Sequence, residues 1–198
     1  RGKTTTLRVR GEEGFRTLIL FDGMRLADPS STQISTPLEH LLNDGIGRVE
    51  VLRGPQGLAY GADAGGIVNI SSRSLEQGFF ANVGVRSGVD GTQKVTGNLG
   101  GSNDVIDYFL SVTDVETDGY NTSQFDTMLR DDDGYTNTSM HGRLGANLSE
   151  NLRLEVVHRD VDGDSEFDGC FYKTIVHHCS AIYESSASRA SLEYSSNH

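Results

Sequence analysis

The sequence contains no tryptophan, and its 198 residues include only three prolines and two cysteines. It also lacks any apolar run of about eighteen residues, the length that a membrane-crossing helix requires. The strands of a membrane barrel need only about 9–11 residues, and their side chains alternate between lipid and lumen. The composition therefore excludes a spanning helix and leaves a membrane barrel open.

Basic residues are also scarce. The chain has 17 Lys and Arg against 28 Asp and Glu, which gives a formal net charge of −11. Phosphate backbones are bound by clustered Lys and Arg, so the charge argues against nucleic acid as a partner. It permits the binding of cations.

Catalytic motifs are missing from the sequence as well. The serine pairs at 185–186 and 195–196 have no elbow motif around a nucleophile. His158 falls in an alternating segment, where we predict a lumen-facing polar residue rather than a base. Asp160, Asp162 and Asp164 stand in series without an acid partner for hydrolysis. We therefore expect no enzyme and no organic cofactor.

The two cysteines, Cys170 and Cys179, lie close together in a polar stretch. A disulfide, two free thiols, and a zinc site with His177 and His178 are all compatible with this arrangement. Structural zinc sites more often have about two residues between paired cysteines. We favour the disulfide, and the other two readings stay open.

The most informative segment is 48–70, RVEVLRGPQGLAYGADAGGIVNI. An apolar run at 49–52 stops at Gly54-Pro55, and Gly65-Gly66 precedes a second β-branched run at 67–70. Glycine permits backbone angles that side chains forbid, and proline cannot donate to a strand ladder. The segment predicts a strand, a turn and a strand. No lysine follows the glycines, so it is not a phosphate loop, but an unrelated α/β domain could contain the same pattern.

Upstream of this segment the sequence predicts strands at 5–10 and 17–26 and a helix at 35–42. Thr36 is a candidate N-cap, Pro37 suits the first helical position, and Glu39 completes a near capping box. Gly45 is a fitting stop. The first part of the chain is therefore expected to be mixed α/β.

From about residue 79 the apolar residues recur with a period of two, which predicts about six strands. Val83, Leu110, Leu144 and Leu154 belong to one face, and Arg86, Arg143 and Arg153 to the other. A charged face suits the lumen of a membrane barrel, although a soluble β-sandwich has the same period. Short connections near 101–104 and 149–151 alternate with long acidic ones at 119–135 and 163–184, as barrel turns and outer loops do.

Three ordered motifs carry a family resemblance: 7–11 (LRVRG), 17–25 (TLILFDGMR) and 48–70. They resemble the plug domain of TonB-dependent outer-membrane receptors, and the later strands resemble the cobalamin receptors among them. One departure is that Ala64 runs straight into Gly65, where many relatives have an extra apolar residue. The resemblance implies an α/β plug (its C-terminal portion) at 1–75 and, at 76–198, the N-terminal part of an antiparallel transmembrane β-barrel. We expect a fragment, because six strands cannot close a barrel of about 22.

The resemblance implies a function in the bacterial outer membrane, within lipid. A receptor of this family imports a large, scarce solute such as cobalamin with energy from the TonB energy-coupling protein. A ferric-siderophore receptor of the same family is the nearest alternative. A non-transport adhesin barrel is another, although an adhesin does not need a plug.

The resemblance also assigns site residues. Two plug loops are expected to face outward and touch solute, and Glu50 and Arg53 to pair with the wall. Asp131 and Asp133 alternate around Asp132, so their like charges invite a cation such as calcium, although a solvated acidic loop would look the same. The expected solute contacts are Asp28, Ser30, Ser31, Gln33, Gln56, Leu58 and Tyr60; the expected calcium ligands are Asn121, Asp131, Asp133 and Asp168.

Overall fold

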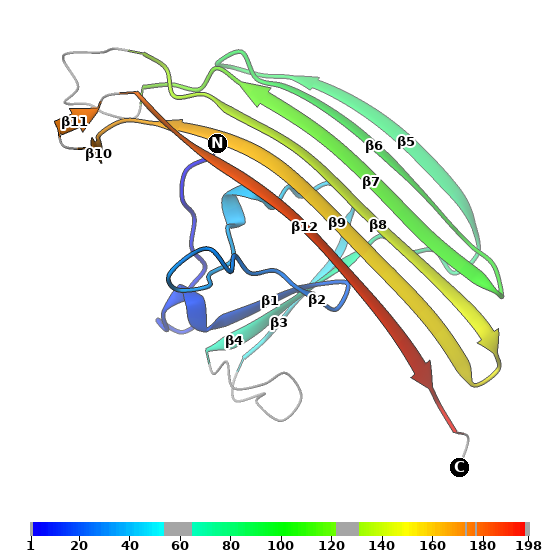
Figure 1. Cartoon of the computed structure of the whole chain (residues 1–198). Coiled ribbons are helices and arrows are strands. Elements are labelled where there is room, and N and C mark those ends of the chain that lie inside the picture. The colour runs from blue at the N-terminus through cyan, green and yellow to red at the C-terminus, as the bar shows by residue number, and fades with distance from the viewer. Residues whose placement is uncertain (1, 54–64, 122–130, 173, 177, 197–198) are drawn as a thin grey trace.

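The chain folds into a small four-stranded sheet seated within the curve of a large six-stranded one, with a separate two-stranded sheet at one end (Figure 1). The computed structural model describes residues 2–53, 65–121, 131–172, 174–176 and 178–196. We call the small sheet and its loops the plug, and the large sheet the wall. No helix in the described part of the chain is long and apolar enough to cross a membrane.

The plug sheet has the strand order β2-β1-β4-β3. β1 runs parallel to β4, and β3 runs antiparallel to β4. Its core consists of Ile19, Phe21, Val68 and Ile70, all at most 6% exposed. These residues come from the β-branched and aromatic runs of the sequence, which pack well on a pleated surface. The bounds are β1 Thr17–Phe21, β2 Met24–Arg25, β3 Ile46–Leu52 and β4 Gly66–Ser72.

A tight turn joins β1 to β2. Phe21 pairs with Met24, and the two residues between them, Asp22 and Gly23, have φ of 46° and 71°. Positive φ at both positions marks the two-residue turn that suits the twist of a hairpin. The strand predicted at 17–26 is therefore a hairpin, and its turn directs Asp22 away from the plug.

Two predictions for the plug were wrong. Residues 5–10 do not form a strand; Arg10 and Gly11 both have positive φ, which turns the chain. In place of a helix at 35–42 there is only a 3₁₀ turn, η2 (Leu38–His40), without a side-chain cap. The Thr36 hydroxyl donates to the carbonyl of Leu26 instead of capping. Burial of Leu38 and Leu41 against the sheet outweighs the local helix signals.

The wall is a six-stranded antiparallel meander in the order β12-β9-β8-β7-β6-β5. This confirms the predicted strand number and topology. The register is continuous apart from one irregularity near the β8–β9 turn. The predicted boundary between residues 75 and 76 lies in the link from plug to wall. The bounds are β5 Gly78–Ser87, β6 Gln93–Ser102, β7 Ile106–Thr117, β8 Tyr135–Ser149, β9 Leu152–Phe167 and β12 Cys179–Tyr194.

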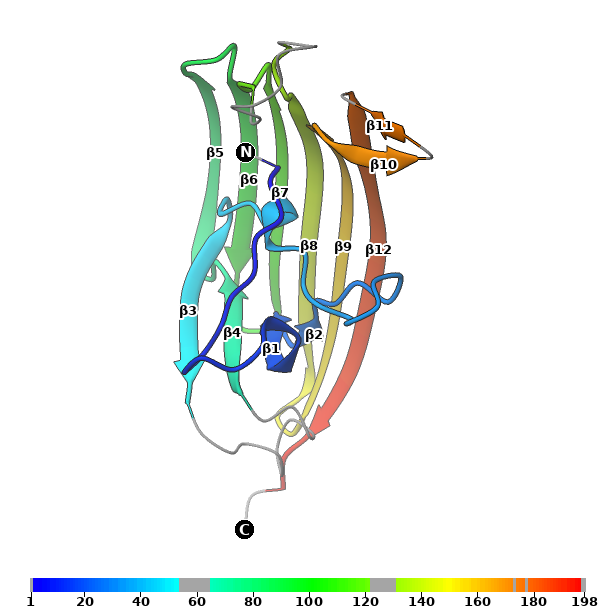
Figure 2. The ribbon, with the colours of Figure 1, turned by 90° about the vertical axis from the view of Figure 1, so that its left-hand side faces the viewer.

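The two ends of the wall differ in their connections (Figure 2). Residues 103–105 and 150–151 make tight turns at what we call the inner end. The outer end has a hairpin turn at Asp90-Gly91, both with positive φ, and the longer connections 118–134 and 168–178. The last of these contains β10 (Cys170–Tyr172) and β11 (Thr174–Val176). This is the predicted alternation of short and long connections.

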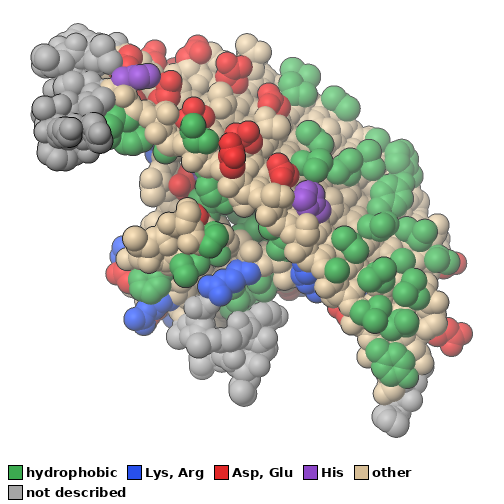
Figure 3. All heavy atoms as spheres, in the orientation of Figure 1, with side chains coloured by type: hydrophobic (Ala, Val, Ile, Leu, Met, Phe, Trp, Pro, Cys, Tyr) green, Lys and Arg blue, Asp and Glu red, His purple; other side chains and the backbone are tan. Residues whose placement is uncertain are grey.

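The two faces of the wall have opposite chemistry. Val83 is 80% exposed and Leu144 51% exposed on the convex face, while Phe109 and Val157 are buried on the concave face against the plug. Arg143 also lies on the concave side, where it contacts Ser72. Figure 3 shows apolar side chains over the convex face toward the inner end and acidic ones toward the outer end.

The prediction for His158 was wrong. It pairs with Gly142 and Ser188 in the row of convex-face residues, and its Nδ1 lies 2.8 Å from Ser188 Oγ. Asp160 and Asp162 share its parity and are exposed on the same face. Alternation fixes which residues share a face, and His158 was assigned to the wrong set.

Candidate plug–wall site and outer-end loops

A buried charged contact joins the plug to the wall. Asp22 Oδ2 lies 2.7 Å from His141 Nε2 on β8 and 3.9 Å from Arg143 Nε. The side chains of Asp22 and His141 are 6% and 3% exposed. The imidazole also stacks on Phe21, with ring centroids 4.0 Å apart. The β1–β2 turn therefore presents one carboxylate to a cationic pocket of the wall.

The protonation of Asp22 follows from its surroundings. Burial alone would raise the pKa of its carboxyl, but hydrogen bonds from His141 and Ser72 outweigh burial and lower that pKa. Hydrogen bonds to the charged form favour it. Asp22 is thus a carboxylate at neutral pH, and His141 Nε2 donates to it.

Further ion pairs surround this contact on the concave face. Arg143 lies 2.5 Å from Asp107, and Arg153 lies 2.7 Å from the other oxygen of Asp107. Arg189 lies 2.8 Å from Glu155 and donates to the carbonyl of Asp22 at 3.3 Å. Because these cations are shared between wall and plug, the interface is polar and largely paired.

Two more contacts lie nearer the outer end. Lys94 forms an ion pair with Asp44, and its side chain is only 5% exposed. Gly45, which follows Asp44, has φ of 75°, and a Cβ at this position would lie 2.7 Å from the ring of Phe109. Lys3 donates to the carbonyl of Glu166 at 2.7 Å and lies 3.8 Å from Asp133. Because a Cβ at position 45 would lie too close to Phe109, Gly45 is needed for the close approach of the plug to the wall, and it does not act as a helix stop.

The residues predicted to hold the plug make no ion pair with the described wall strands. Glu50 pairs with Arg48 at 2.5 Å and accepts from Asn69, so it stays within the plug sheet. Arg53 is exposed and makes no ion pair with any residue in the described ranges. His141 and Lys94 of the wall instead pair with Asp22 and Asp44 of the plug. The sequence feature that could have identified these two residues is a histidine or lysine at an inward-facing position of an alternating strand.

A small cavity lies between the plug and the strands β9 and β12. It measures about 50 Å³ and is lined by His40, Arg159 and Tyr183 among others. His40 stacks on Tyr183 with centroids 4.7 Å apart, and Asn137 Nδ2 donates to its Nδ1 at 3.3 Å. Burial lowers the pKa of His40, with Glu39 acting against it. The imidazole is therefore neutral at pH 7 and carries its proton on Nε2.

Residues 28–33, part of the predicted solute contacts, form a self-bonded turn. Asp28 Oδ1 accepts from the backbone N and the hydroxyl of Ser30, at 2.8 and 2.6 Å. Ser31 N donates to the Asp28 carbonyl at 3.3 Å, and Gln33 is exposed. The remaining predicted contacts, Gln56, Leu58 and Tyr60, lie outside the described residues.

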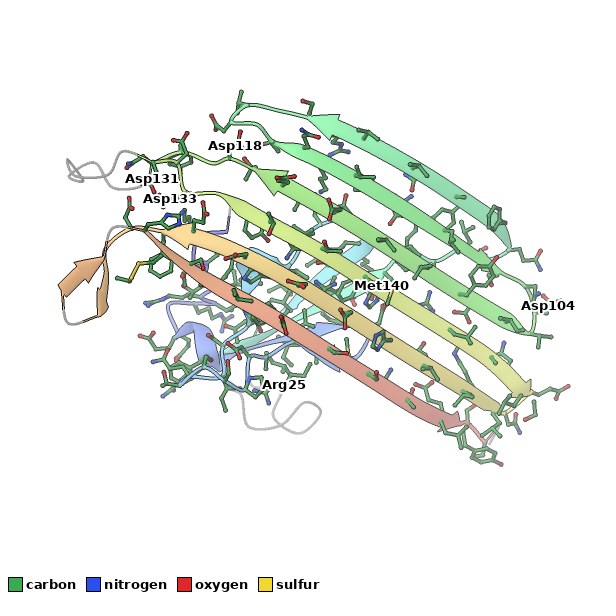
Figure 4. The ribbon with its side chains drawn as sticks, turned by 45° about the horizontal axis from the view of Figure 1, so that its top comes forward. Arg25, Asp104, Asp118, Asp131, Asp133 and Met140 are labelled. Atoms are coloured by element: carbon green, nitrogen blue, oxygen red, sulfur yellow. A yellow bond between two sulfur atoms is a disulfide. The ribbon has the colours of Figure 1, made fainter. Side chains whose placement is uncertain are left out.

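The predicted calcium ligands all lie at the outer end. Figure 4 shows Asp118, Asp131 and Asp133 near one another there, with Asp104 at the opposite end. Asn121 N donates to Asp132 Oδ1 at 3.2 Å. Gly134 N donates to the carboxylate of Glu166 on β9 at 2.8 Å, and Glu166 N donates to the carbonyl of Gly134 at 3.0 Å. Asp131 pairs with His178 at 3.1 Å. Within the described part of the chain, no three His, Cys, Asp or Glu side chains are placed to hold a metal.

The two cysteines form a disulfide. Cys170 and Cys179 are joined, with Cα atoms 6.4 Å apart, and they stand nine positions apart in sequence. The bond links the start of β10 to the start of β12 at the outer end. The disulfide rules out zinc ligation and free thiols as alternatives for this pair.

Comparison with known proteins defines the class. Residues 1–68 match the model of the TonB-dependent receptor plug domain. The vitamin B12 transporter BtuB of Photobacterium profundum is 27% identical over 172 residues, covering 86% of this chain and 28% of that protein. The iron-regulated outer membrane virulence protein of Vibrio cholerae is 37% identical over 93 residues, covering 41% of this chain and 14% of that protein.

Solved structures agree on the fold. A variant of the ferric enterobactin receptor from Pseudomonas aeruginosa superposes with a TM-score of 0.65 at 20% identity, covering 91% of this chain and 31% of that one. A plug seated against an antiparallel barrel wall is thus a shared architecture. Residues 1–68 match the plug domain of TonB-dependent receptors, and together these similarities support a TonB-dependent receptor that resembles the cobalamin receptors. The chain spans about 28% of the length of the curated relative it matches. The expectation of a non-enzyme agrees with this family.

Proposed function

We propose that the chain is the plug and first wall of a TonB-dependent receptor that imports a large, scarce solute such as cobalamin across the bacterial outer membrane. The observation that carries the proposal is the plug sheet docked inside the wall through buried, paired charges, chiefly Asp22 with His141. A plug that blocks a polar lumen suits a gated importer. An adhesin barrel needs no such contact.

The convex face supports a membrane position. Its apolar residues reach Val85 on β5, which is level with Val95, Asp114, Thr138 and Asp162 through the strand pairs. On β9 the apolar residues of this face end at Val156, which is six positions nearer the inner end than Asp162. The edge of the apolar zone therefore descends across the sheet. Among the described strand residues, Ile182 on β12 is the one apolar residue of this face found well beyond the edge.

The slope of this edge matches a tilted barrel. Ala190 of β12 pairs with Val156, so the edge lies six residues lower on β9 and β12 than on β5. At ~3.3 Å per residue this is a fall of about 20 Å. The five strand spacings from β5 to β12, at ~4.8 Å each, cover about 24 Å. That is a slope of about 40°, and barrel strands tilt by about 35–45° from the membrane normal. In a tilted barrel the edge would be level with the membrane surface. The acidic outer zone would then lie beyond the hydrocarbon.

The family alternatives differ in solute. Cobalamin is favoured by the alignment with the vitamin B12 transporter over 86% of the chain, while the iron-regulated relative aligns over 41%. We assign the exposed turn at 28–33 to solute contact, since Ser30 and Gln33 are accessible there. TonB is the expected energy-coupling partner. The disulfide is assigned to the extracellular side.

Uptake by the complete receptor tests the function. Cells that depend on it should accumulate labelled cobalamin, and removal of the energy-coupling protein should abolish that accumulation. Uptake of a ferric siderophore instead would favour the alternative, and uptake of neither would favour an adhesin. Truncating Ser30, Ser31 and Gln33 to alanine should weaken solute binding, and unchanged affinity would remove this turn from the site.

We also propose a calcium site at the outer end, with Asn121, Asp131, Asp133 and Asp168 as ligands. Calcium prefers six to eight oxygen ligands in loose geometry, which two adjacent loops can supply. Asp131 Oδ1 is buried and makes no hydrogen bond within the described residues, so one carboxylate oxygen is left to bind a cation. Binding would displace His178 from Asp131 and Lys3 from Asp133.

Calorimetry on the complete receptor tests the calcium site. Solute affinity should rise with calcium, and Asp131→Asn with Asp133→Asn should remove that rise. Asp104→Asn, at the inner turn, is the matched control and should keep it. Equal affinity in calcium and in chelator, with no heat from calcium, would leave these aspartates as surface charge.

A further inference from the structure

One buried cation of the wall lacks a carboxylate. Arg159 on β9 is 8% exposed, and its Nη2 donates to the carbonyl of His40 at 3.4 Å. Its guanidinium also lies over the ring of Phe21, 5.5 Å from the centroid. No Asp or Glu oxygen of the described residues comes within 4.0 Å of it. One long hydrogen bond and one ring contact leave most of its five donors unused.

The other buried or half-buried cations of the concave face are paired. Lys94 has Asp44, Arg143 has Asp107, and Arg189 has Glu155. The strand neighbours of Arg159 supply no carboxylate. Along β9 the adjacent inward residues are Val157 and Val161, and across the strands it pairs with His141 and Ala187.

An unpaired buried guanidinium is energetically unfavourable. Arginine stays protonated in proteins, so it cannot relieve burial by losing its proton. Burying a charge without a partner costs several kcal/mol, which an opposite charge offsets. A site of this kind therefore attracts an anion.

The cavity beside Arg159 has the size and donors for one anionic group. At about 50 Å³ it holds a few waters, or a single carboxylate or phosphate, but not a whole solute. Ser185 and a second guanidinium, Arg25, also line it. Arg25 is marked in Figure 4 on the plug side of the sheet. The lining thus combines two cations with a hydroxyl, a set that recognises oxyanions.

We propose that this cavity binds an oxyanion, a carboxylate or a phosphate, held chiefly by Arg159. The anion is either a free ion in the lumen or a group on the imported solute. The second source rests on the proposed transport function, whereas the first does not. The planar guanidinium of arginine suits both a carboxylate and a phosphate, because its paired N–H donors match two oxygens of either group.

Phosphate binding to the complete receptor in detergent tests the site, with inorganic phosphate as the probe and calorimetry as the readout. Arg159→Gln should weaken phosphate affinity at least tenfold, and Arg159→Lys should restore part of it. Arg86→Gln, an exposed lumen-facing arginine on β5, is the control and should leave affinity unchanged. Native affinity in Arg159→Gln, in protein with an unaltered circular dichroism spectrum, would overturn the proposal, and so would the absence of phosphate binding in the unmodified receptor.

Competition separates the two sources. If the anion is a group on the solute, phosphate should weaken cobalamin binding in the unmodified receptor and not in Arg159→Gln. If it is a free ion, phosphate should bind without affecting cobalamin. Cobalamin uptake by an unmodified receptor that does not bind phosphate would remove the anion site and leave the transport function standing.

Discussion

The plug and the wall place their apolar residues on opposite sides. The plug sheet hides Phe21 and Ile70 in its own core. The wall exposes Val83 and Leu144 on its convex side and turns polar residues such as Asn137 toward the plug. The plug is built like a water-soluble domain and the wall like a membrane sheet. Their shared interface combines buried charge pairs with apolar contacts such as that of Phe109.

A polar interface has a consequence for movement. Ion pairs and hydrogen bonds across it can be exchanged for water at modest net cost, typically about 0.5–1.5 kcal/mol for one hydrogen bond. An apolar interface of the same size would lose its burial energy outright. The plug can thus be a stable unit that is held reversibly, which suits a gate.

Disrupting the plug core should produce the largest difference in stability between the plug and the wall. Phe21→Ala should destabilise the plug by about 3–5 kcal/mol, because the buried ring packs in the core and stacks on His141. Hydrogen exchange should show plug amides losing protection while wall amides keep theirs. Phe79→Ala, a 66% exposed phenylalanine on β5, is the control and should have little effect on the plug. Equal loss of protection in both sheets would mean that they fold as one unit.

The convex face should be the next most sensitive. Leu144→Arg should cost about 2–4 kcal/mol in lipid, the range for a cation near the bilayer midplane. Thr138→Arg, six positions toward the acidic zone on the same strand and face, should cost about 1 kcal/mol or less. Folding into lipid vesicles under urea titration measures both. Similar costs at the two positions would place them at the same depth and contradict the sloping edge.

The disulfide should act locally at the outer end. Reducing Cys170–Cys179 should lower the stability of this loop by about 2–3 kcal/mol at most on the chain-entropy model. Proteolysis of the outer connection should accelerate while the strands stay resistant. In the exported protein, thiol labelling without reductant should modify neither cysteine; labelling of both would contradict the bond.

Acid should weaken the plug–wall contact. The pKa of Asp22 is lowered in the folded protein, so its contribution is fully present above the ordinary value of 3.8. It is lost as pH falls from there through the folded pKa. The expected loss is about 1–3 kcal/mol, the usual range for hydrogen bonds to a charged group. Exchange of β1 amides below pH 4 measures it.

Two variants sharpen the acid test. Asp22→Asn should weaken docking at neutral pH and remove most of the acid dependence. Asp28→Asn, in the exposed turn, should leave both unchanged. Acid dependence that survives in Asp22→Asn would assign it to another carboxylate, such as Asp44 or Asp107.

The wall could be predicted from the sequence and much of the plug's detail could not. Alternation over long strands is a strong signal because each strand repeats it, as Leu144 and Arg143 show. The helix at 35–42 failed because a local capping pattern was outweighed by packing of Leu38 and Leu41 on the sheet. Contacts between Asp22 and His141 join residues 119 positions apart, and no local pattern specifies such a pair.

The most direct test of the account is the accessibility of spin labels on the convex face of the complete receptor in lipid vesicles. Labels on Val83→Cys, Leu144→Cys and Ala190→Cys should collide with lipid-soluble oxygen, because they lie within the apolar zone. Labels on Thr138→Cys, Asp162→Cys and Glu184→Cys, beyond the sloping edge, should collide with a water-soluble nickel reagent instead. If all six sites respond alike, or if the first three are shielded from both reagents, the convex face is not in lipid and the barrel account is contradicted.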